Sequence, residues 1–320
     1  MENFTNFFES DIECLANTGN CFVYRTKNDT GEGVITQYYI MPGIYFFYND
    51  IRMTDGKNKN KLPIPEMLEI NHCREGRFEC EFENGNCQFI GAGDLSVHLL
   101  PQKTVRTFFP MGRYHGISIG IDLNEAEKTI ARLESITGKL DIDLRKIADN
   151  LSRTDTCFIL RDKSVINHIF SELYNATPGM IAHYLKVKVL ELLMYLNDIN
   201  TGELTEEKRY FYKNQVDVVK SIHDFMIEHI DKHFTLQKLS DMFGIPLTSM
   251  KVCFKGVYGS SIYSYMRSYR MQAATILLKG NSSITEIAMK TGYTNPSKFS
   301  ENFKREFGML PTEFRKQMSK

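Results

Sequence analysis

The sequence contains no apolar run long enough to cross a lipid bilayer. Its longest runs, such as Ile44–Tyr48 and Ile276–Leu278, fall far short of the roughly 18 to 20 residues that a membrane-spanning helix requires. The segment Met1–Asp11 carries acidic side chains and lacks a basic stretch followed by an apolar one, so no secretory signal is predicted. We therefore expect a cytoplasmic protein that has no membrane partner.

Paired cysteine spacings are absent as well. The seven cysteines are an odd number and none belongs to a Cys-x-x-Cys pair, which favours reduced thiols over disulfides or structural zinc. Cys73, Cys80 and Cys87 recur at seven-residue intervals, a pattern that a thiol or metal site could use. We expect this spacing to place them on different strands with alternating faces, and we predict neither a metal site nor a cofactor.

Catalytic signatures are the third absence. His72, His98 and His115 stand singly on predicted strands, without the His-x-His spacing that brings metal ligands onto one face of a strand. No Gly-x-Ser-x-Gly elbow and no Gly-rich phosphate loop occurs in the chain. We expect no enzyme activity. A jelly-roll enzyme whose helical part only mediates assembly is the disfavoured alternative.

The formal net charge of zero hides an asymmetry along the chain. Residues 215–320 hold 15 Lys and Arg against 9 Asp and Glu, whereas the remaining residues hold 24 against 30. A basic module therefore follows an acidic body, an arrangement compatible with nucleic-acid binding. Many solvated helical faces are also basic, so charge alone does not decide this.

A chain of 320 residues is about twice the usual size of a domain, which predicts two domains. The first part reads as short strands separated by turn signals, an order typical of a β-sandwich or a barrel such as the jelly roll. The expected strands are Cys21–Arg25, Gln37–Ile40, Gly43–Phe47, Met67–His72, Arg77–Phe82, Cys87–Ile90, Ser96–Leu100, Val105–Phe109 and Tyr114–Ile121.

Helical periodicity replaces the strand pattern from Asn124 onward. A helix over about 178–196 has an apolar stripe wide enough to pack on more than one surface, so it is either an internal core helix or part of a dimer interface. The polar stretch 201–214 is the expected interdomain linker.

One helical arrangement occurs twice after Val216. In each copy an amphipathic helix is followed by a Gly-containing turn, at Gly244-Ile245-Pro246 or at Gly292-Tyr293, and then by a second helix that ends near a Gly. Both copies read as helix-turn-helix units, whose second helix can enter a major groove. The helix Ile262–Leu278 between them, about 25 Å long, could separate the two second helices by about 34 Å, one turn of B-DNA.

The residues that carry a family resemblance lie in this last third. They are Ile262, Arg270, Ala274, Leu277-Leu278, Ile284-Thr285-Glu286-Ile287-Ala288, Gly292-Tyr293, Asn295-Pro296-Ser297-Lys298-Phe299, Phe303-Lys304, Phe307-Gly308 and Pro311-Thr312-Glu313-Phe314-Arg315. In order and spacing they resemble the AraC/XylS-type transcriptional regulators. The match covers about the last 105 residues. The first part resembles, more loosely, the jelly-roll sensor domain found in that family.

The resemblance and the patterns together predict an α+β fold. We expect a β jelly-roll, cupin-like effector-sensing domain over 1–123 and a helical dimerisation or linker region over 124–200. The linker 201–214 follows, and an all-α DNA-binding domain of two helix-turn-helix units occupies 215–320. The implied function is sequence-specific transcriptional regulation by a homodimer, with double-stranded DNA, a small-molecule effector and RNA polymerase as partners. A barrel that merely dimerises, without an effector, is the alternative.

The exposed faces of the two second helices are the predicted DNA contacts. The family's base-contact positions map onto Thr248, Lys251 and Val252, where Lys251 can donate to guanine and Val252 can pack on a thymine methyl group. On the other helix Glu301 can accept from cytosine, or instead form a salt bridge with Lys298, Lys304 or Arg305. A solvated helix face is the structural alternative for all of them. The full predicted set is Thr248, Ser249, Lys251, Val252, Lys255, Pro296, Ser297, Lys298, Ser300, Glu301 and Lys304.

Aromatic density marks the expected effector site. Several rings lie near two arginines in the predicted barrel, which suits a small organic anion at the barrel mouth, although most of the rings must form the core. The predicted effector residues are Tyr38, Tyr45, Phe47, Arg74 and Arg77.

Overall fold

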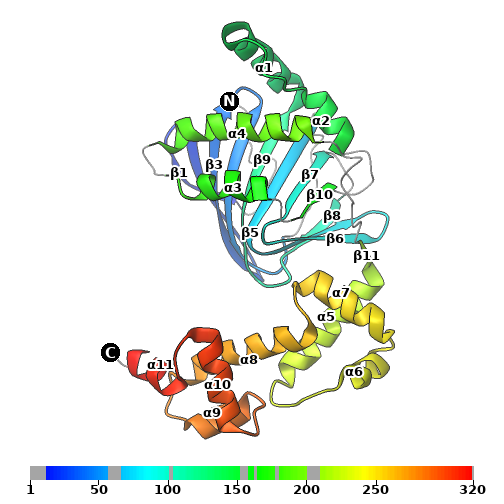
Figure 1. Cartoon of the computed structure of the whole chain (residues 1–320), viewed down its shortest axis with the longest axis vertical. Coiled ribbons are helices and arrows are strands. Elements are labelled where there is room, and N and C mark those ends of the chain that lie inside the picture. The colour runs from blue at the N-terminus through cyan, green and yellow to red at the C-terminus, as the bar shows by residue number, and fades with distance from the viewer. Residues whose placement is uncertain are drawn as a thin grey trace. The chain divides into compact units, whose positions relative to one another are not determined.

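The computed structural model describes residues 12–56, 66–100, 104–151, 158–161, 164–176, 180–199 and 210–318. The chain divides into two compact units, Met1–Tyr210 and Phe211–Lys320 (Figure 1). The first unit is built on antiparallel strands with helices packed against them, and the second is almost entirely helical. The predicted α+β fold class is therefore confirmed. Of the predicted linker 201–214, residues 201–209 lie outside the described residues, and α5 begins at Lys213 within its last part.

The first unit contains one antiparallel sheet system in the order β1-β2-β3-β4-β9-β5, continued from β5 by β7, β6 and β8. Every predicted strand is present. Sequence reasoning missed β1 and the three-residue β10, which pairs with β7. The bounds are β1 (Ile12–Asn17), β2 (Cys21–Asn28), β3 (Gly31–Met41), β4 (Ile44–Arg52), β5 (Met67–Phe82), β6 (Asn86–Gly91), β7 (Leu95–Leu100), β8 (Thr104–Phe108), β9 (Tyr114–Asp122) and β10 (Phe158–Leu160).

Strand β5 joins two predicted strands into one and serves two sets of neighbours. Its first half lies between β9 and β7, and its second half lies between β6 and β8. The register shifts between Cys73 and Glu75, and Gly76 has φ +82°. A Cβ on Gly76 would lie 1.9 Å from the carbonyl oxygen of Arg113, so only glycine fits where the strand bends.

The continuity of β5 corrects the expectation for the cysteines. Cys73 and Cys80 lie on the same strand, and only Cys87 lies on its neighbour β6. All three side chains are buried. Burial raises the pKa of Cys73 to about 12, which keeps that thiol protonated and unreactive.

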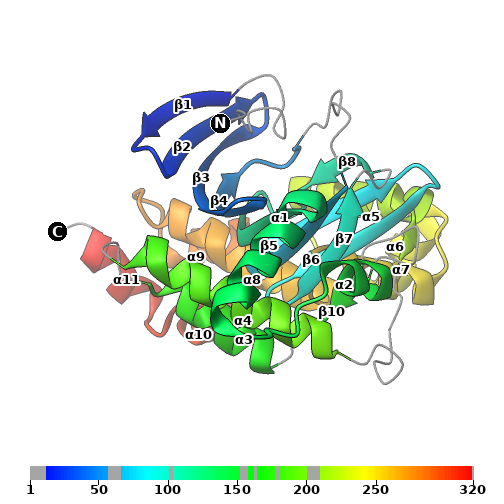
Figure 2. The ribbon, with the colours of Figure 1, turned by 90° about the horizontal axis from the view of Figure 1, so that it is seen from above.

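Alternation along the central strands separates a helix-covered face from an opposite face. Ile117, Ile119 and Ile121 of β9 join the large core beneath the helices, while Gly116 and Ser118 point the other way. Helices α3 and α4 pack on each other and cover that apolar face (Figures 1 and 2). The helices of this unit are α1 (Leu123–Thr137), α2 (Leu144–Leu151), α3 (Ser164–Tyr174) and α4 (Ile181–Asp198).

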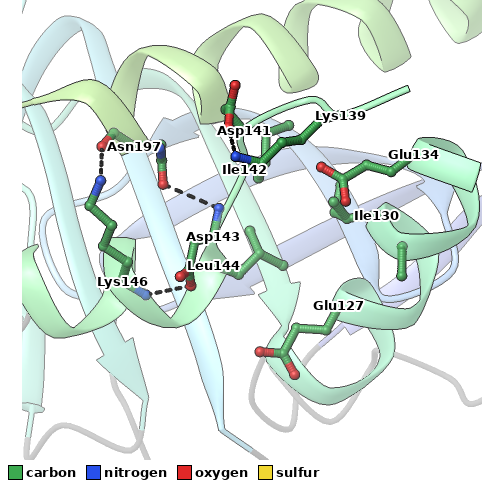
Figure 3. A pocket seen from close by; sticks show the side chains of 11 residues that line it. Glu127, Ile130, Glu134, Lys139, Asp141, Ile142, Asp143, Leu144, Lys146 and Asn197 are labelled. Atoms are coloured by element: carbon green, nitrogen blue, oxygen red, sulfur yellow. Dashed lines mark hydrogen bonds and ion pairs between the residues drawn. The ribbon is translucent and has the colours of Figure 1, made fainter. Parts of the chain in front are cut away.

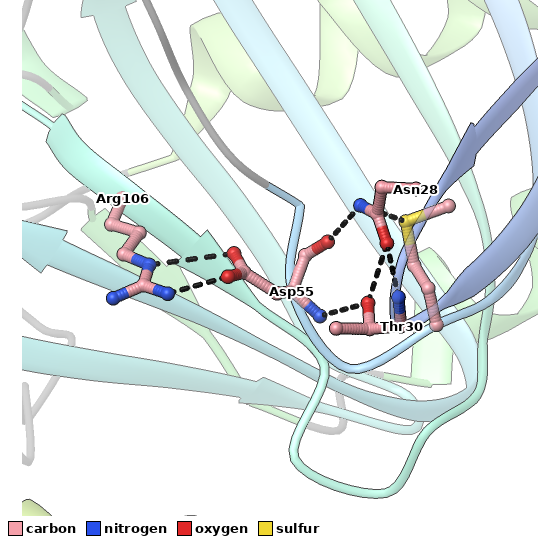
Figure 4. Close-up of polar contacts among 5 residues, drawn as sticks. Asn28, Thr30, Asp55 and Arg106 are labelled. Carbon is pink, nitrogen blue, oxygen red and sulfur yellow. Dashed lines mark hydrogen bonds and ion pairs between the residues drawn. The ribbon is translucent and has the colours of Figure 1, made fainter. Parts of the chain in front are cut away.

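A polar network ties the β2–β3 hairpin to β8 (Figure 4). Asn28 Nδ2 donates to the Asp55 carbonyl at 2.7 Å, and the Asp55 amide donates to Thr30 Oγ1 at 3.2 Å. Arg106 of β8 donates through two nitrogens to the Asp55 carboxylate and stacks its guanidinium over the Phe108 ring. The hydrogen bonds with Asp55 raise the pKa of Arg106. Asp55 therefore joins elements that are distant in sequence.

The second unit begins with the short β11 (Phe211–Tyr212) and then contains helices only. Its helix α8 buries Ile262, Met266, Arg270, Met271 and Ala274. Of these, Met271 and Ala274 belong to a core shared with residues of α9 and α10. Among the described residues, no helix combines the length and apolar character needed to cross a membrane. The helices are α5 (Lys213–Glu228), α6 (Leu236–Phe243), α7 (Leu247–Tyr258), α8 (Ile262–Leu277), α9 (Ile284–Lys290), α10 (Pro296–Phe307) and α11 (Pro311–Met318).

Candidate nucleic-acid interface

Helices α6 and α7 form the first helix pair. Thr235 caps α6 by accepting a hydrogen bond from the Lys238 amide at 3.1 Å, and Gly244 ends that helix. Ser240 Oγ donates to the Ile245 carbonyl at 2.6 Å, which fixes the turn against α6. Pro246 occupies the N-cap of α7, where no side chain caps the helix. The Ser240 hydroxyl therefore holds this turn from the α6 side, and no polar side chain caps the start of α7.

Helix α7 presents two different faces. Met250, Cys253 and Phe254 are buried, and they fix which side of the helix is turned away from the core. Val252 is 46% exposed, although an apolar side chain gains nothing from water. Of the predicted contact residues on this helix, Thr248, Lys251, Val252 and Lys255 are exposed and Ser249 is half-buried.

Helices α9 and α10 form the second pair, and their caps are complete. Ser283 and Glu286 make a reciprocal capping box at the start of α9. Asn295 Oδ1 accepts from the amides of Ser297 at 2.9 Å and Lys298 at 3.3 Å, with Pro296 at the first helical position. The sequence signals at this helix start therefore act as predicted.

The outward face of α10 carries charges of both signs. Phe299 and Phe303 are fully buried, as expected for core aromatic residues. Lys298 Nζ lies 2.8 Å from Glu301 Oε2, and this contact lowers the pKa of Glu301. Glu301 thus forms the salt bridge that the sequence offered as the alternative to a base contact, and its partner is Lys298. Of the predicted residues, Ser297, Lys298, Glu301 and Lys304 are exposed, whereas Pro296 and Ser300 are half-buried.

Two details of α10 modify the predicted donor set. Ser300 Oγ donates to the Pro296 carbonyl at 2.9 Å, so its proton is engaged within the helix. Arg305, which sequence reasoning considered only as a partner of Glu301, is exposed and donates to Asn302 Oδ1. Its position beside Lys304 was the available sequence signal. The last turn of α10 therefore offers two adjacent cations.

The predicted effector residues do not gather in one place. Tyr38 packs against the helix-covered core, whereas Tyr45 and Phe47 belong to the cluster on the opposite face of the sheet. Arg74 is exposed, with its guanidinium 4.7 Å from the centre of the Tyr174 ring. Arg77 packs against the Gly91 backbone beside Asp94, and burial lowers its pKa. The sheet itself separates the aromatic members of this set.

The three histidines of the predicted strands, His72, His98 and His115, have protein partners. His98 Nε2 lies 2.8 Å from Glu69 Oε2, and His72 Nδ1 lies 3.2 Å from the hydroxyl of Tyr174. No group of three or more metal-ligating side chains occurs in the described part of the chain. His115 packs edge-on against Tyr174.

A pocket lined by residues of α1, α2 and the end of α4 contains charges of both signs (Figure 3). None of the five predicted effector residues lines it. Its polar groups bind one another: Lys146 Nζ donates to the Asn197 carbonyl at 3.0 Å, and Asn197 Oδ1 accepts from the Asp143 amide at 3.1 Å. Lys139 and Asp141 form an ion pair. The two contacts of Asn197 connect α2 and the residue before it to the end of α4. The lining of the pocket does not indicate a ligand.

Comparison with known proteins places a match on the helical unit. A family model described as a helix-turn-helix domain matches residues 239–317. The chain is 30% identical over 131 residues to the virulence regulon transcriptional activator VirF of Yersinia enterocolitica, covering 41% of this chain and 48% of VirF. It is 33% identical over 144 residues to the transcriptional regulator ExsA of Pseudomonas aeruginosa, covering 45% of this chain and 50% of ExsA.

These matches span about half the length of the curated relatives. Among solved structures, a transcriptional regulator with an AraC-type DNA-binding domain from Chromobacterium violaceum is 20% identical, with a TM-score of 0.31. That alignment covers 33% of this chain and 96% of the other.

Proposed function

Because the carboxy-terminal part of the chain is an AraC-type helix-turn-helix domain, we propose that the protein is a sequence-specific DNA-binding transcriptional regulator. One observation carries the proposal: the unit contains two helix pairs, and the second helix of each buries one face and exposes the other. Two major-groove readers in one chain suit a site with two short blocks about one helical turn apart.

The side chains on these two faces suggest separate tasks. On α7, Lys251 can donate to N7 and O6 of guanine, while Val252 and the Thr248 methyl group can contact thymine methyl groups. Ser249 and Lys255 flank these positions and suit phosphate contacts. All five are proposed to contact DNA.

On α10 we assign phosphate binding to the cations. Lys298, Lys304 and the adjacent Arg305 are exposed and can hold the DNA backbone. Glu301 reads cytosine N4 only if it exchanges its contact with Lys298 for the base. Pro296, Ser297 and Ser300 lie at the helix start, the end that usually approaches the groove.

We further propose that the first unit senses a small-molecule effector and forms the homodimer. In this scheme residues 1–123 bind the effector and residues 124–200 contribute the dimer contacts. Residues 201–214 connect them to the DNA-binding part, 215–320, which engages the operator and, through promoter binding, RNA polymerase. Effector binding would bias how the two DNA-binding domains of a dimer are presented, which couples the two binding free energies.

Selection of binding sites from random DNA with the purified protein tests the central proposal. Anisotropy titration of the selected sequence at two salt concentrations then separates base reading from phosphate binding. We expect a motif of two short blocks about one helical turn apart. Weak binding without sequence preference, in the presence and absence of candidate effectors, would contradict the assignment.

A further inference from the structure

Helix α8 belongs to both helix-turn-helix units at once. Near its start, the Tyr265 hydroxyl lies 2.9 Å from His223 Nε2 of α5, and its ring packs near Tyr258 and Phe254 of α7. Near its end, Met271 and Ala274 share a core with the residues of α9 and α10. The orientation of the second helix-turn-helix unit relative to the first therefore depends on the contacts made at the middle of α8.

Arg270 occupies that middle position and is only 6% exposed. Its Nε donates to the Ile230 carbonyl at 3.1 Å, and one terminal nitrogen donates to the Lys232 carbonyl at 2.6 Å. Both carbonyls lie in the segment that leads from α5 to α6. Because burial lowers the pKa of Arg270, these acceptors are needed to stabilise its charge inside the protein.

His233 connects Arg270 to the turn of the second helix-turn-helix unit, between α9 and α10. Its Nε2 lies 2.6 Å from the Gly292 carbonyl oxygen, and its Nδ1 lies 3.1 Å from the other terminal nitrogen of Arg270. A carbonyl can only accept, so His233 donates from Nε2 to Gly292, and the same Arg270 nitrogen lies 3.0 Å from Nε2 as well as 3.1 Å from Nδ1. The imidazole of His233 thus lies in contact with both Arg270 and the turn that joins α9 to α10.

Gly292 shows how closely the two helix-turn-helix units approach each other at this junction. Its φ is +82°, and a Cβ there would lie 2.8 Å from the Ile230 carbonyl oxygen and 3.1 Å from Cζ of Arg270. The absence of a side chain lets the α9–α10 turn lie directly against the segment that precedes α6. The backbone at Ile230, the backbone at Gly292 and the buried guanidinium of Arg270 therefore lie in contact with one another.

We propose that Arg270 and His233 are positioning residues that fix α10 relative to α7 and thereby set the spacing between DNA blocks that the chain accepts. This inference rests on the proposed function. Hydrogen bonds across the junction oppose rotation of one helix-turn-helix unit against the other. Two linked binding modules gain affinity from each other only when their separation matches the site.

The substitution His233→Ala tests the proposal in the full chain, because His233 is exposed and its removal leaves the Arg270 contacts to carbonyls intact. The matched control is His229→Ala, because that imidazole contacts the carbonyl and ring of Phe225 and the ring of Phe234. Gly292→Ala is a second variant that disturbs the same junction from the other side.

Binding is measured on a series of DNA duplexes that carry the selected blocks at spacings changed by about 1 or 2 base pairs. We expect the wild type and His229→Ala to lose about 10-fold or more in affinity away from the preferred spacing. His233→Ala should differ by less than about 3-fold across the series, while it still binds each block alone with wild-type affinity. An unchanged spacing profile in His233→Ala and Gly292→Ala overturns the positioning role.

A measurement without DNA separates this inference from the proposed function. Spin labels introduced through non-canonical amino acids at Lys251 and Lys304 report the separation of the two outward helix faces. The distance distribution should be narrow in the wild type and in His229→Ala, and broad in His233→Ala. Equal widths overturn the inference even if sequence-specific binding is confirmed. A broadened distribution in a protein that does not select DNA supports the junction and contradicts the function.

Discussion

His72 lies on β5 with its imidazole stacked on Phe170, the two ring centroids 4.1 Å apart. Burial lowers the pKa of His72 to about 4, because an imidazolium would lose its hydration there. The unfolded chain binds a proton near the usual value of about 6.5, and the folded chain does so only near the lower pKa. Between these two values acidification therefore favours unfolding.

This residue makes a pH dependence testable. The free energy of unfolding of the first unit should fall as the pH is lowered from about 6.5 to 4, by about 3 kcal/mol from this group alone. His72→Phe should remove that part of the decrease, whereas the exposed His168→Gln should retain it. Urea unfolding followed by circular dichroism at several pH values measures the difference. Parallel curves for His72→Phe and the wild type would refute this explanation.

Lys251 and Lys298 have similar exposure and different surroundings. Lys251 stands on a face of α7 beside the apolar Val252, whereas Lys298 is paired with Glu301. We expect Lys251→Ala to cost about 1 to 3 kcal/mol at one base pair of the selected site and to relax specificity there. Lys298→Ala should weaken binding to all DNA sequences alike and should reduce the slope of log affinity against log salt concentration by about 1. Anisotropy titrations on matched and mutated sites distinguish the two patterns.

Glu301→Gln is the control for this comparison. It releases Lys298 from its pairing without removing the cation. If Lys298 holds phosphate, affinity for every sequence should rise or stay equal. A loss confined to one cytosine position would instead assign base reading to Glu301.

At the scale of an element, α9 is short and depends on its cap. It spans Ile284–Lys290, too few residues to be stable by itself, and Ser283 and Glu286 satisfy amides at its start. The carboxylate accepts from the Ser283 amide at 2.7 Å, and this hydrogen bond lowers the pKa of Glu286. The cap therefore stabilises the first turn in addition to the packing of the helix on α8 and α10.

Ser283→Ala should destabilise the helical unit by about 1 kcal/mol, the usual contribution of a serine cap. Thr285→Ala, at an exposed position of the same turn, is the control and should be neutral or slightly stabilising, because alanine has the higher helix propensity. The urea midpoint of the helical unit measures both changes. Equal midpoints for the two variants would mean that packing alone fixes the start of α9.

At the scale of the whole molecule, the chain combines two units of different kind. The sheet-based unit has an excess of acidic residues and the helical unit has an excess of basic residues, and the two excesses cancel to a net charge of zero. A cation-rich surface on the helical unit suits DNA, whereas an acidic partner unit is repelled by it. This division agrees with the proposed assignment of DNA binding to the helical unit.

The effector proposal is testable at the same scale. A small organic anion that binds the first unit should raise its free energy of unfolding by RT ln(1 + [L]/Kd), and therefore its melting temperature, because ligands of the native state stabilise it. Thermal shifts are measured over a panel of small carboxylates, with Tyr45→Leu and Arg74→Ala compared against the wild type. No shift with any compound would favour a barrel that only dimerises. Turnover with equimolar bound metal would favour the enzyme alternative.

Local sequence determined most of the elements. Short runs rich in Val, Ile, Phe and Tyr, separated by turn signals, located every predicted strand, and Asn295-Pro296 located the start of α10. Helical periodicity identified Phe299 and Phe303 as core and left Lys298 and Lys304 outside. Such signals act over a few residues, so they survive without knowledge of the fold.

The tertiary structure decided how distant segments meet. It joined Met67–His72 and Arg77–Phe82 into the single bent β5, and it placed Tyr38 on the opposite face of the sheet from Tyr45. It also brought His233 and Gly292, 59 positions apart, to either end of one hydrogen bond. Such contacts depend on how strands pair and helices pack across the whole unit, and no pattern within a short window of sequence contains that information.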